Sequence, residues 1–138
     1  MTNVSYLTKA MKIFSKEPTQ KMYNDVLLAL VRDSRNDEAV HIPVEINKAA
    51  KLEESMVYGM VKGSDNKYYY IICTNTEELY GSGYEVSVLM KLYDILTRSF
   101  SDTDIGGVCI DPWSSGNCVI TNDYIGALLR LIDSDEEL

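Results

Sequence analysis

Three cysteines and one histidine are the residues of this chain that could supply a nucleophile or bind a soft metal. Cys73, Cys109 and Cys118 are widely separated, and no pair has the Cys-x-x-Cys spacing of a zinc site or a redox motif. Each cysteine lies in an apolar run, where a free cysteine usually acts as a small buried hydrophobe. Any nucleophile–histidine pair would depend on His41 alone. We therefore predict no catalytic residue, no metal site and no cofactor.

Paired carboxylates are the next candidates, because two of them can divide acid and base work between them. Glu53-Glu54, Glu77-Glu78 and Asp102/Asp104 are such pairs. They fall in predicted caps or loops, and adjacent residues on a helix do not face each other. Gly81-Ser-Gly83 and Gly106-Gly107 lack the spacing and the lysine of a phosphate-binding loop.

The run Asp111-Pro112-Trp113 follows a predicted strand and forms a candidate recognition corner. Proline fixes the direction of the chain, and the aspartate can accept hydrogen bonds from nearby backbone N–H groups. Two interpretations stay open. Trp113 either fills the core or remains partly exposed beside the polar turn at 114–117 and binds a partner.

Ten tyrosines against two phenylalanines are the other unusual feature. In a strand, Tyr68 and Tyr70 would lie on one face and Tyr69 on the other. A sheet covered on both faces would bury them. A sheet with one open face would display tyrosines, which are enriched at protein interfaces. We predict an interaction surface made of these residues: Tyr68, Tyr69, Tyr70, Asp111, Pro112 and Trp113.

Two helices are expected to open the chain. Apolar residues recur at helical spacing from Val4 to Phe14, and Glu17-Pro18 ends this segment because the residue before proline resists helical geometry. A second helix is predicted from about Thr19, which can cap it, to Asp33. The run from Asp33 to Asp37 has turn composition.

The middle of the chain has strand patterns. Residues 40–42 predict a short strand ended by Pro43, and residues 44–55 a mixed loop with some helical character. The clearest hairpin joins residues 56–61 to 68–73 through the turn at 62–66. Residues 74–79 predict a capped helical turn.

The remaining predicted elements are a strand at 85–89, a helix at 91–100, strands at 108–110 and 118–120, and a helix at 122–132. A single helix over 85–100 is the alternative to the first two. Leu92, Leu96 and Phe100 lie on one face of the predicted helix at 91–100. Ile72, Val108, Ile110, Leu128 and Leu129 are predicted to be largely buried.

This order of elements predicts one α+β domain over residues 1–138, with helices packed against a single mixed or antiparallel sheet of about five or six strands. It has a helical N-terminal segment at 1–17 and an acidic C-terminal tail at 133–138.

Three segments, in this order, resemble the SseB N-terminal domain family. The helix before His41-Ile-Pro43 is similar to its opening, a short helix followed by a V-x-V-P strand. The run from Tyr68 to Leu79 is similar to its strand and "FTS-x-EEL" segment, and Ile105 to Trp113 to its "G-x-x-I-N-P" segment. The resemblance covers the chain from about Thr19 onward.

The chain departs from this family at Cys73, where an aromatic residue is common, and at Asp111, where asparagine is common. The resemblance implies a bacterial cytoplasmic domain of unknown function. The family has no established catalytic residues that could be carried over to this chain.

Composition narrows the class of partner. The formal net charge is −8, with 21 acidic residues against 13 scattered basic ones, so nucleic acid is not an expected partner. No apolar run is long enough for a membrane helix, and no signal sequence is evident, so we expect a cytoplasmic protein without membrane association. We predict a non-catalytic protein-interaction or regulatory module. A small-ligand sensor, with an amino acid as one candidate ligand, is the alternative, and a hydrolase or transferase is less expected. A homodimer stays open.

Overall fold

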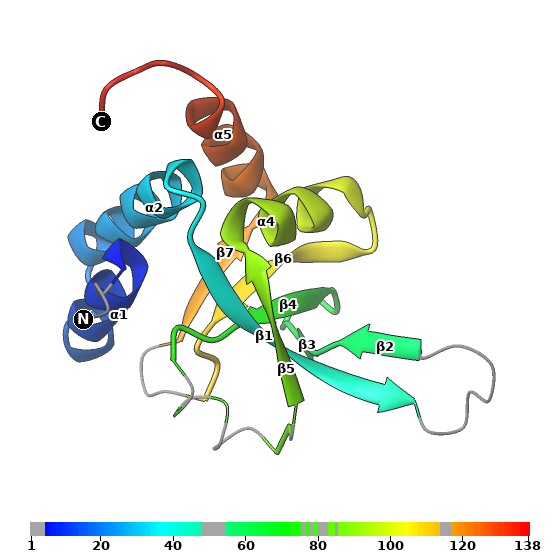
Figure 1. Cartoon of the computed structure of the whole chain (residues 1–138). Coiled ribbons are helices and arrows are strands. Elements are labelled where there is room, and N and C mark those ends of the chain that lie inside the picture. Colours follow the sequence, from blue (N-terminus) through cyan, green and yellow to red (C-terminus); the bar gives the residue numbers. More distant parts are fainter. Residues whose placement is uncertain are drawn as a thin grey trace.

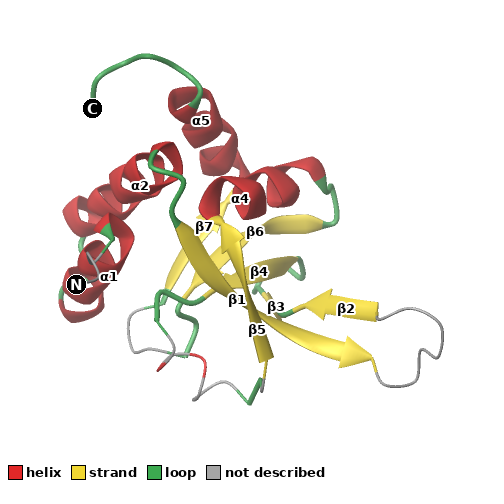
Figure 2. Ribbon diagram, in the orientation of Figure 1, coloured by secondary structure: helices red, strands yellow, loops and turns green. Residues whose placement is uncertain are grey.

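The computed structural model describes residues 5–47, 55–75, 77, 79, 83–84, 86–113 and 117–138. These residues form an α+β fold in which helices cover one face of a mixed sheet (Figures 1 and 2). The predicted α+β class is confirmed.

Two helices, α1 (Tyr6–Lys16) and α2 (Gln20–Arg35), pack side by side at the N-terminal end (Figure 1). Ser5 and Thr19 cap them, each accepting a hydrogen bond from a backbone N–H of the first turn. Both helices were predicted, and Thr19 is the predicted cap.

A buried carboxylate joins these two helices. Asp33 lies in α2 and accepts hydrogen bonds from the N–H groups of Tyr6, at 3.1 Å, and Leu7, at 2.8 Å. The first N–H groups of a helix lack partners within the helix, and Asp33 supplies them for α1. The turn predicted at 33–37 is confined to residues 36–37, because α2 continues to Arg35.

The described strands form two sheets. One has the order β2-β1-β5, made of β2 (Ser55–Tyr58), β1 (Ala39–Asn47) and β5 (Val86–Lys91). The other has the order β3-β4-β6-β7, made of β3 (Met60–Lys62), β4 (Tyr68–Ile72), β6 (Ile105–Ile110) and β7 (Cys118–Thr121). Only β4 and β6 pair in parallel; the other pairs are antiparallel.

Gly59 explains why there are two sheets and not the single sheet that we predicted. Its N–H donates to the Pro43 carbonyl at 2.7 Å, and its carbonyl accepts from the Ile71 N–H at 3.3 Å. The run before Gly59 therefore pairs with β1, and the run after it pairs with β4. The predicted hairpin is confirmed for β3 and β4, whereas residues 55–58 belong to the other sheet.

β1 passes through Pro43, where we predicted the strand to end. Its pairing with β5 is continuous from Ala39 to Val44. The N–H and C=O of one strand residue point to the same side, and the Pro43 carbonyl points to Gly59, away from β5. The N–H that proline lacks is thus not needed for the β1–β5 ladder. Residues 44–47, predicted as part of a loop, extend β1, and residues 48–54 lie outside the described part of the chain.

The second half of the chain follows the prediction closely. β5 leads directly into α4 (Leu92–Ser101), so the strand followed by a helix is confirmed and the single long helix is wrong. α5 (Asn122–Ile132) has the predicted bounds. The predicted helical turn at 74–79 lies partly outside the described residues.

The core lies between the helices and one face of the four-stranded sheet. Ile72, Val108 and Ile110 are fully buried there, and Leu128 is nearly so, as predicted. Leu129 is only partly buried and packs at the edge of this core. Leu129 is therefore less buried than the other four residues of the prediction.

Candidate functional site

The corner at Asp111 is built on a strained backbone and a buried carboxylate. Asp111 follows β6 with a φ of 51° and is 4% exposed. Its two oxygens accept hydrogen bonds from the Thr74 N–H at 2.9 Å and the Thr74 hydroxyl at 2.7 Å. Aspartate tolerates this left-handed conformation better than most residues. The corner therefore holds the start of the Pro112-Trp113 segment in one direction.

Burial raises the pKa of the Asp111 carboxyl, and the hydrogen bonds from Thr74 offset only part of this shift. The predicted role of Asp111 as a surface contact is wrong, because its side chain is buried and bonded to Thr74.

Trp113 borders an apolar hollow of about 400 Å³ on the face of the four-stranded sheet opposite the core. We call it the Trp113 hollow. Trp113 is half-buried, and its ring centre lies 6.0 Å from that of Tyr84. The apolar residues that line the hollow are Val61, Tyr69, Cys109, Pro112, Trp113 and Val119. Trp113 is not among the residues of the hydrophobic core.

Tyr69 forms a wall of this hollow. Its side chain is 6% exposed, and its hydroxyl donates a 2.6 Å hydrogen bond to the Asp65 carboxylate. This bond, and after it burial, raises the pKa of Tyr69 to about 12. The same bond lowers the pKa of Asp65. At neutral pH Tyr69 is therefore a neutral donor that is already engaged, and its ring is fixed.

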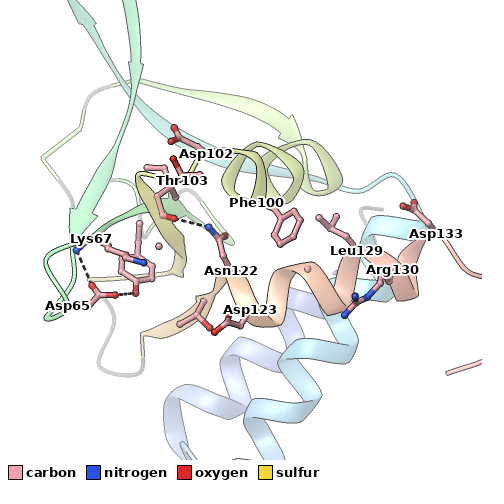
Figure 3. Close-up of a pocket in the computed structure, with 15 residues that line it drawn as sticks. Asp65, Lys67, Phe100, Asp102, Thr103, Asn122, Asp123, Leu129, Arg130 and Asp133 are labelled. Carbon is pink, nitrogen blue, oxygen red and sulfur yellow. Dashed lines mark hydrogen bonds between the residues drawn. The ribbon is translucent and has the colours of Figure 1, made fainter.

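A second, larger hollow of about 690 Å³ shares Tyr69 with the first and lies between α4, α5 and the β3–β4 turn (Figure 3). We call it the aspartate groove, after Asp65, Asp102, Asp123 and Asp133, which line it. Lys67 and Arg130 are its basic residues. Tyr69, Phe100, Ile105, Gly106, Gly126 and Leu129 contribute its apolar surface.

Asn122 forms hydrogen bonds to two of the elements that line the aspartate groove. Its side-chain amide donates to the carbonyls of Ser99, at 3.0 Å, and Ile105, at 2.8 Å. Its amide oxygen lies 2.8 Å from the Ser99 hydroxyl. One side chain thus connects the end of α4, the start of β6 and the start of α5. This fixes the relative positions of the elements that line the groove.

Phe100 is the residue of this groove that sequence reasoning misplaced. We predicted it on one helix face with Leu92 and Leu96, which are fully buried, but Phe100 is 52% exposed. Its ring packs on Gly126 of α5, where an alanine Cβ would lie 2.7 Å from a ring carbon. Gly126 inside a helix was the available signal, since glycine there costs about 0.5–1 kcal/mol and suggests a close contact.

All three cysteines are free and buried. Burial is the main cause that raises the pKa of Cys109 to about 11 and that of Cys118 to about 12, so both are neutral thiols at pH 7. His41 exchanges two backbone hydrogen bonds with Cys73, which is fully buried. Within the described ranges, no group of three or more metal-binding side chains lies close together.

The structure brings only part of the predicted surface together. Tyr69, Pro112 and Trp113 line the same hollow. Tyr68 is 47% exposed but lines neither hollow, and Tyr70 is buried in the core. Tyr70 packs in the core on one face of β4, and the Tyr69 ring lies against Gly63 and Gly106 on the other, so an open tyrosine face did not form. The predicted polar turn beside Trp113 lies at 114–116, outside the described residues, apart from the exposed Asn117.

No protein-family model, curated protein or solved structure matches this chain. Within the part of the chain that the structure describes, no helix has the length and apolarity to cross a membrane. The resemblance to the SseB N-terminal domain family stays a prediction from the sequence.

Proposed function

We propose that this protein is a non-catalytic interaction module that binds a segment of another polypeptide at the Trp113 hollow. The observation that carries the proposal is the half-buried Trp113, which lies outside the core and beside an apolar hollow. With the resemblance to the SseB N-terminal domain family, the partner would be another cytoplasmic protein of a bacterium.

Preorganisation supports this role. A partner that docks on a mobile side chain must offset the entropy lost on ordering it. Here the chain before Trp113 is already fixed by the buried Asp111 and by Pro112. Tyr84 lies against the indole. An aromatic residue held in this way is typical of those that dominate the binding energy of an interface.

The polar groups of the Trp113 hollow favour a polypeptide over a small metabolite. A small-ligand site needs a few polar groups that converge on the ligand. The Tyr69 hydroxyl is already bonded to Asp65, and Lys62, Ser64, Asp65 and Asn117 are all exposed. Cys109 also lines the hollow, but as a neutral thiol it is a poor nucleophile. The sensor and the enzyme are therefore less well supported.

The proposal can be tested with a phage-displayed library of random peptides that lack tryptophan. We expect selection on the wild-type protein to enrich peptides with a large apolar side chain. Trp113→Ala should weaken binding of these peptides about 30-fold, which corresponds to about 2 kcal/mol, without preventing folding. Tyr68→Ala is the matched control, because Tyr68 is an exposed aromatic residue of the same sheet that lines neither hollow.

Thermal unfolding of both variants would accompany the binding assay. A folded Trp113→Ala protein that retains full peptide binding would overturn the proposal, and so would a library that yields no binder. If Trp113 instead completed the core, its truncation would destabilise the protein by about 3–5 kcal/mol and abolish binding only through unfolding.

A further inference from the structure

We infer that the partner segment is basic, with an arginine or lysine that enters the aspartate groove next to the apolar side chain in the Trp113 hollow. This inference rests on the proposed function and specifies the chemistry of its partner. It is argued from the continuity of the two hollows, from their charge and from the position of Phe100.

The two hollows are parts of one surface. Tyr69 and Asp65 line both of them, so the Tyr69 side chain is their common wall. The hydrogen bond between these two residues fixes the wall. An extended segment that places one side chain beside Trp113 can therefore place a neighbouring side chain in the aspartate groove without leaving the protein surface.

The charge of the groove selects a cationic side chain. Four aspartates face two basic residues, Lys67 and Arg130, which leaves an excess of two negative charges. Among the described residues the single ion pair is Lys91–Asp37, outside the groove, so none of these aspartates forms an ion pair with a described cation, although the charge of Lys67 helps to lower the pKa of Asp65. Asp102 and Asp133 accept hydrogen bonds from neutral donors only, the Asp104 N–H and the Tyr93 hydroxyl. An acidic segment would be repelled, also by the net charge of −8.

Phe100 gives the groove a surface that suits a guanidinium or ammonium group. Its ring packs on the Gly126 backbone and remains 52% exposed to the groove. A cation above an aromatic ring is attracted by the negative charge of the ring face. The aliphatic stem of arginine or lysine can meanwhile cover apolar surface at Leu129. An aromatic ring that shares a groove with carboxylates binds a cation better than either feature alone.

Asp123 and Asp133 are the residues to substitute, because they lie on or next to α5 on one side of the groove (Figure 3). The test uses the peptides selected on the wild-type protein. We expect these peptides to be enriched in arginine or lysine next to the apolar residue. Asp123→Asn/Asp133→Asn should weaken their binding about fivefold to tenfold at low salt, and added salt should reduce this difference.

The matched control removes the same charge elsewhere. Glu17→Gln/Asp25→Asn changes two exposed acids that line neither hollow, and it should alter binding less than twofold. Replacing the arginine or lysine of a selected peptide by glutamine should abolish the effect of the groove substitutions but not that of Trp113→Ala.

The possible outcomes separate the two proposals. Selected peptides that depend on Trp113 but carry no basic residue would overturn the basic partner and leave the interaction module standing. Equal weakening by the groove variant and the control variant would attribute the effect to net charge, and would also overturn the inference. Peptides that bind independently of Trp113, or no peptides at all, would overturn both proposals.

Discussion

Asp111 shows how a single residue can position a site without contacting a partner. Its carboxylate is buried, its backbone is left-handed, and it holds Thr74 by two hydrogen bonds. The sequence indicated a corner here but could not tell whether the aspartate was exposed. That depended on Thr74, which is distant in the chain and adjacent only in the fold.

We expect Asp111→Asn to fold normally. It should also lack the loss of stability that the wild type undergoes when Asp111 ionises with rising pH. The folded protein holds the Asp111 proton more tightly than the unfolded chain does, because burial raises its pKa. Its contribution to stability therefore falls as the pH rises from the ordinary value of 3.8 towards the raised value, and stays low above it. Asparagine has no charge to desolvate, tolerates the left-handed backbone and can still exchange hydrogen bonds with Thr74.

Urea unfolding of the wild type and Asp111→Asn between about pH 4 and pH 7 measures this effect. As the pH rises, the free energy of unfolding of Asp111→Asn should increase relative to that of the wild type. A difference that is constant with pH would contradict the account. Asp111→Ala leaves the Thr74 N–H without its acceptor and strains the backbone, so it should lower the free energy of unfolding by about 2 kcal/mol at pH 4 and by less as the pH rises.

The three cysteines should react with iodoacetamide slowly in the native protein at pH 7 and rapidly in urea. Cys109 and Cys118 are neutral thiols because burial raises their pKa to about 11 and about 12, and Cys73 is fully buried. Mass spectrometry of the labelled protein identifies each site. Fast native-state labelling of any one cysteine would contradict this description and would favour a reactive role for it.

At the scale of elements, the helices and the β3–β4 hairpin could be predicted because their signals are local. The cap at Thr19, the turn residues at 62–66 and the apolar spacing of α5 all act within a few residues. The division into two sheets could not be predicted, since it depends on Gly59 bonding to Pro43 and Ile71 at once. The continuation of β1 through Pro43 also depends on the tertiary structure, because the edge of β1 on which proline lacks an N–H faces Gly59 and not β5.

Two leucines on neighbouring helices test where the core ends and the aspartate groove begins. Leu96 of α4 is fully buried, whereas Leu129 of α5 is partly buried and lines the aspartate groove. We expect Leu96→Ala to lower the free energy of unfolding by about 2–5 kcal/mol and Leu129→Ala by about 1 kcal/mol. Urea unfolding gives both values. Equal losses would show that Leu129 belongs to the core and that the groove is closed.

At the scale of the whole molecule, the sequence indicated the residues of the Trp113 hollow but not the aspartate groove. Tyr69, Pro112 and Trp113 were predicted as interaction residues because aromatic residues are enriched at interfaces and proline fixes the chain. The groove combines a turn, the end of α4, the start of β6 and one face of α5, and none of these segments is unusual by itself. In the sequence its aspartates contribute only to the overall net charge of −8. A negative net charge can also serve solubility, so it does not indicate an acidic groove.

The central claim is that a partner segment occupies the Trp113 hollow, and the fluorescence of Trp113 tests it most directly. Trp113 is the only tryptophan of the chain, so its emission reports on this site alone. Titration with a selected tryptophan-free peptide should shift the emission to shorter wavelength and saturate at the same Kd as binding measured with a labelled peptide, because docking removes water from the half-buried indole. A peptide that binds and saturates while the Trp113 emission stays unchanged would place the binding site elsewhere and contradict the account.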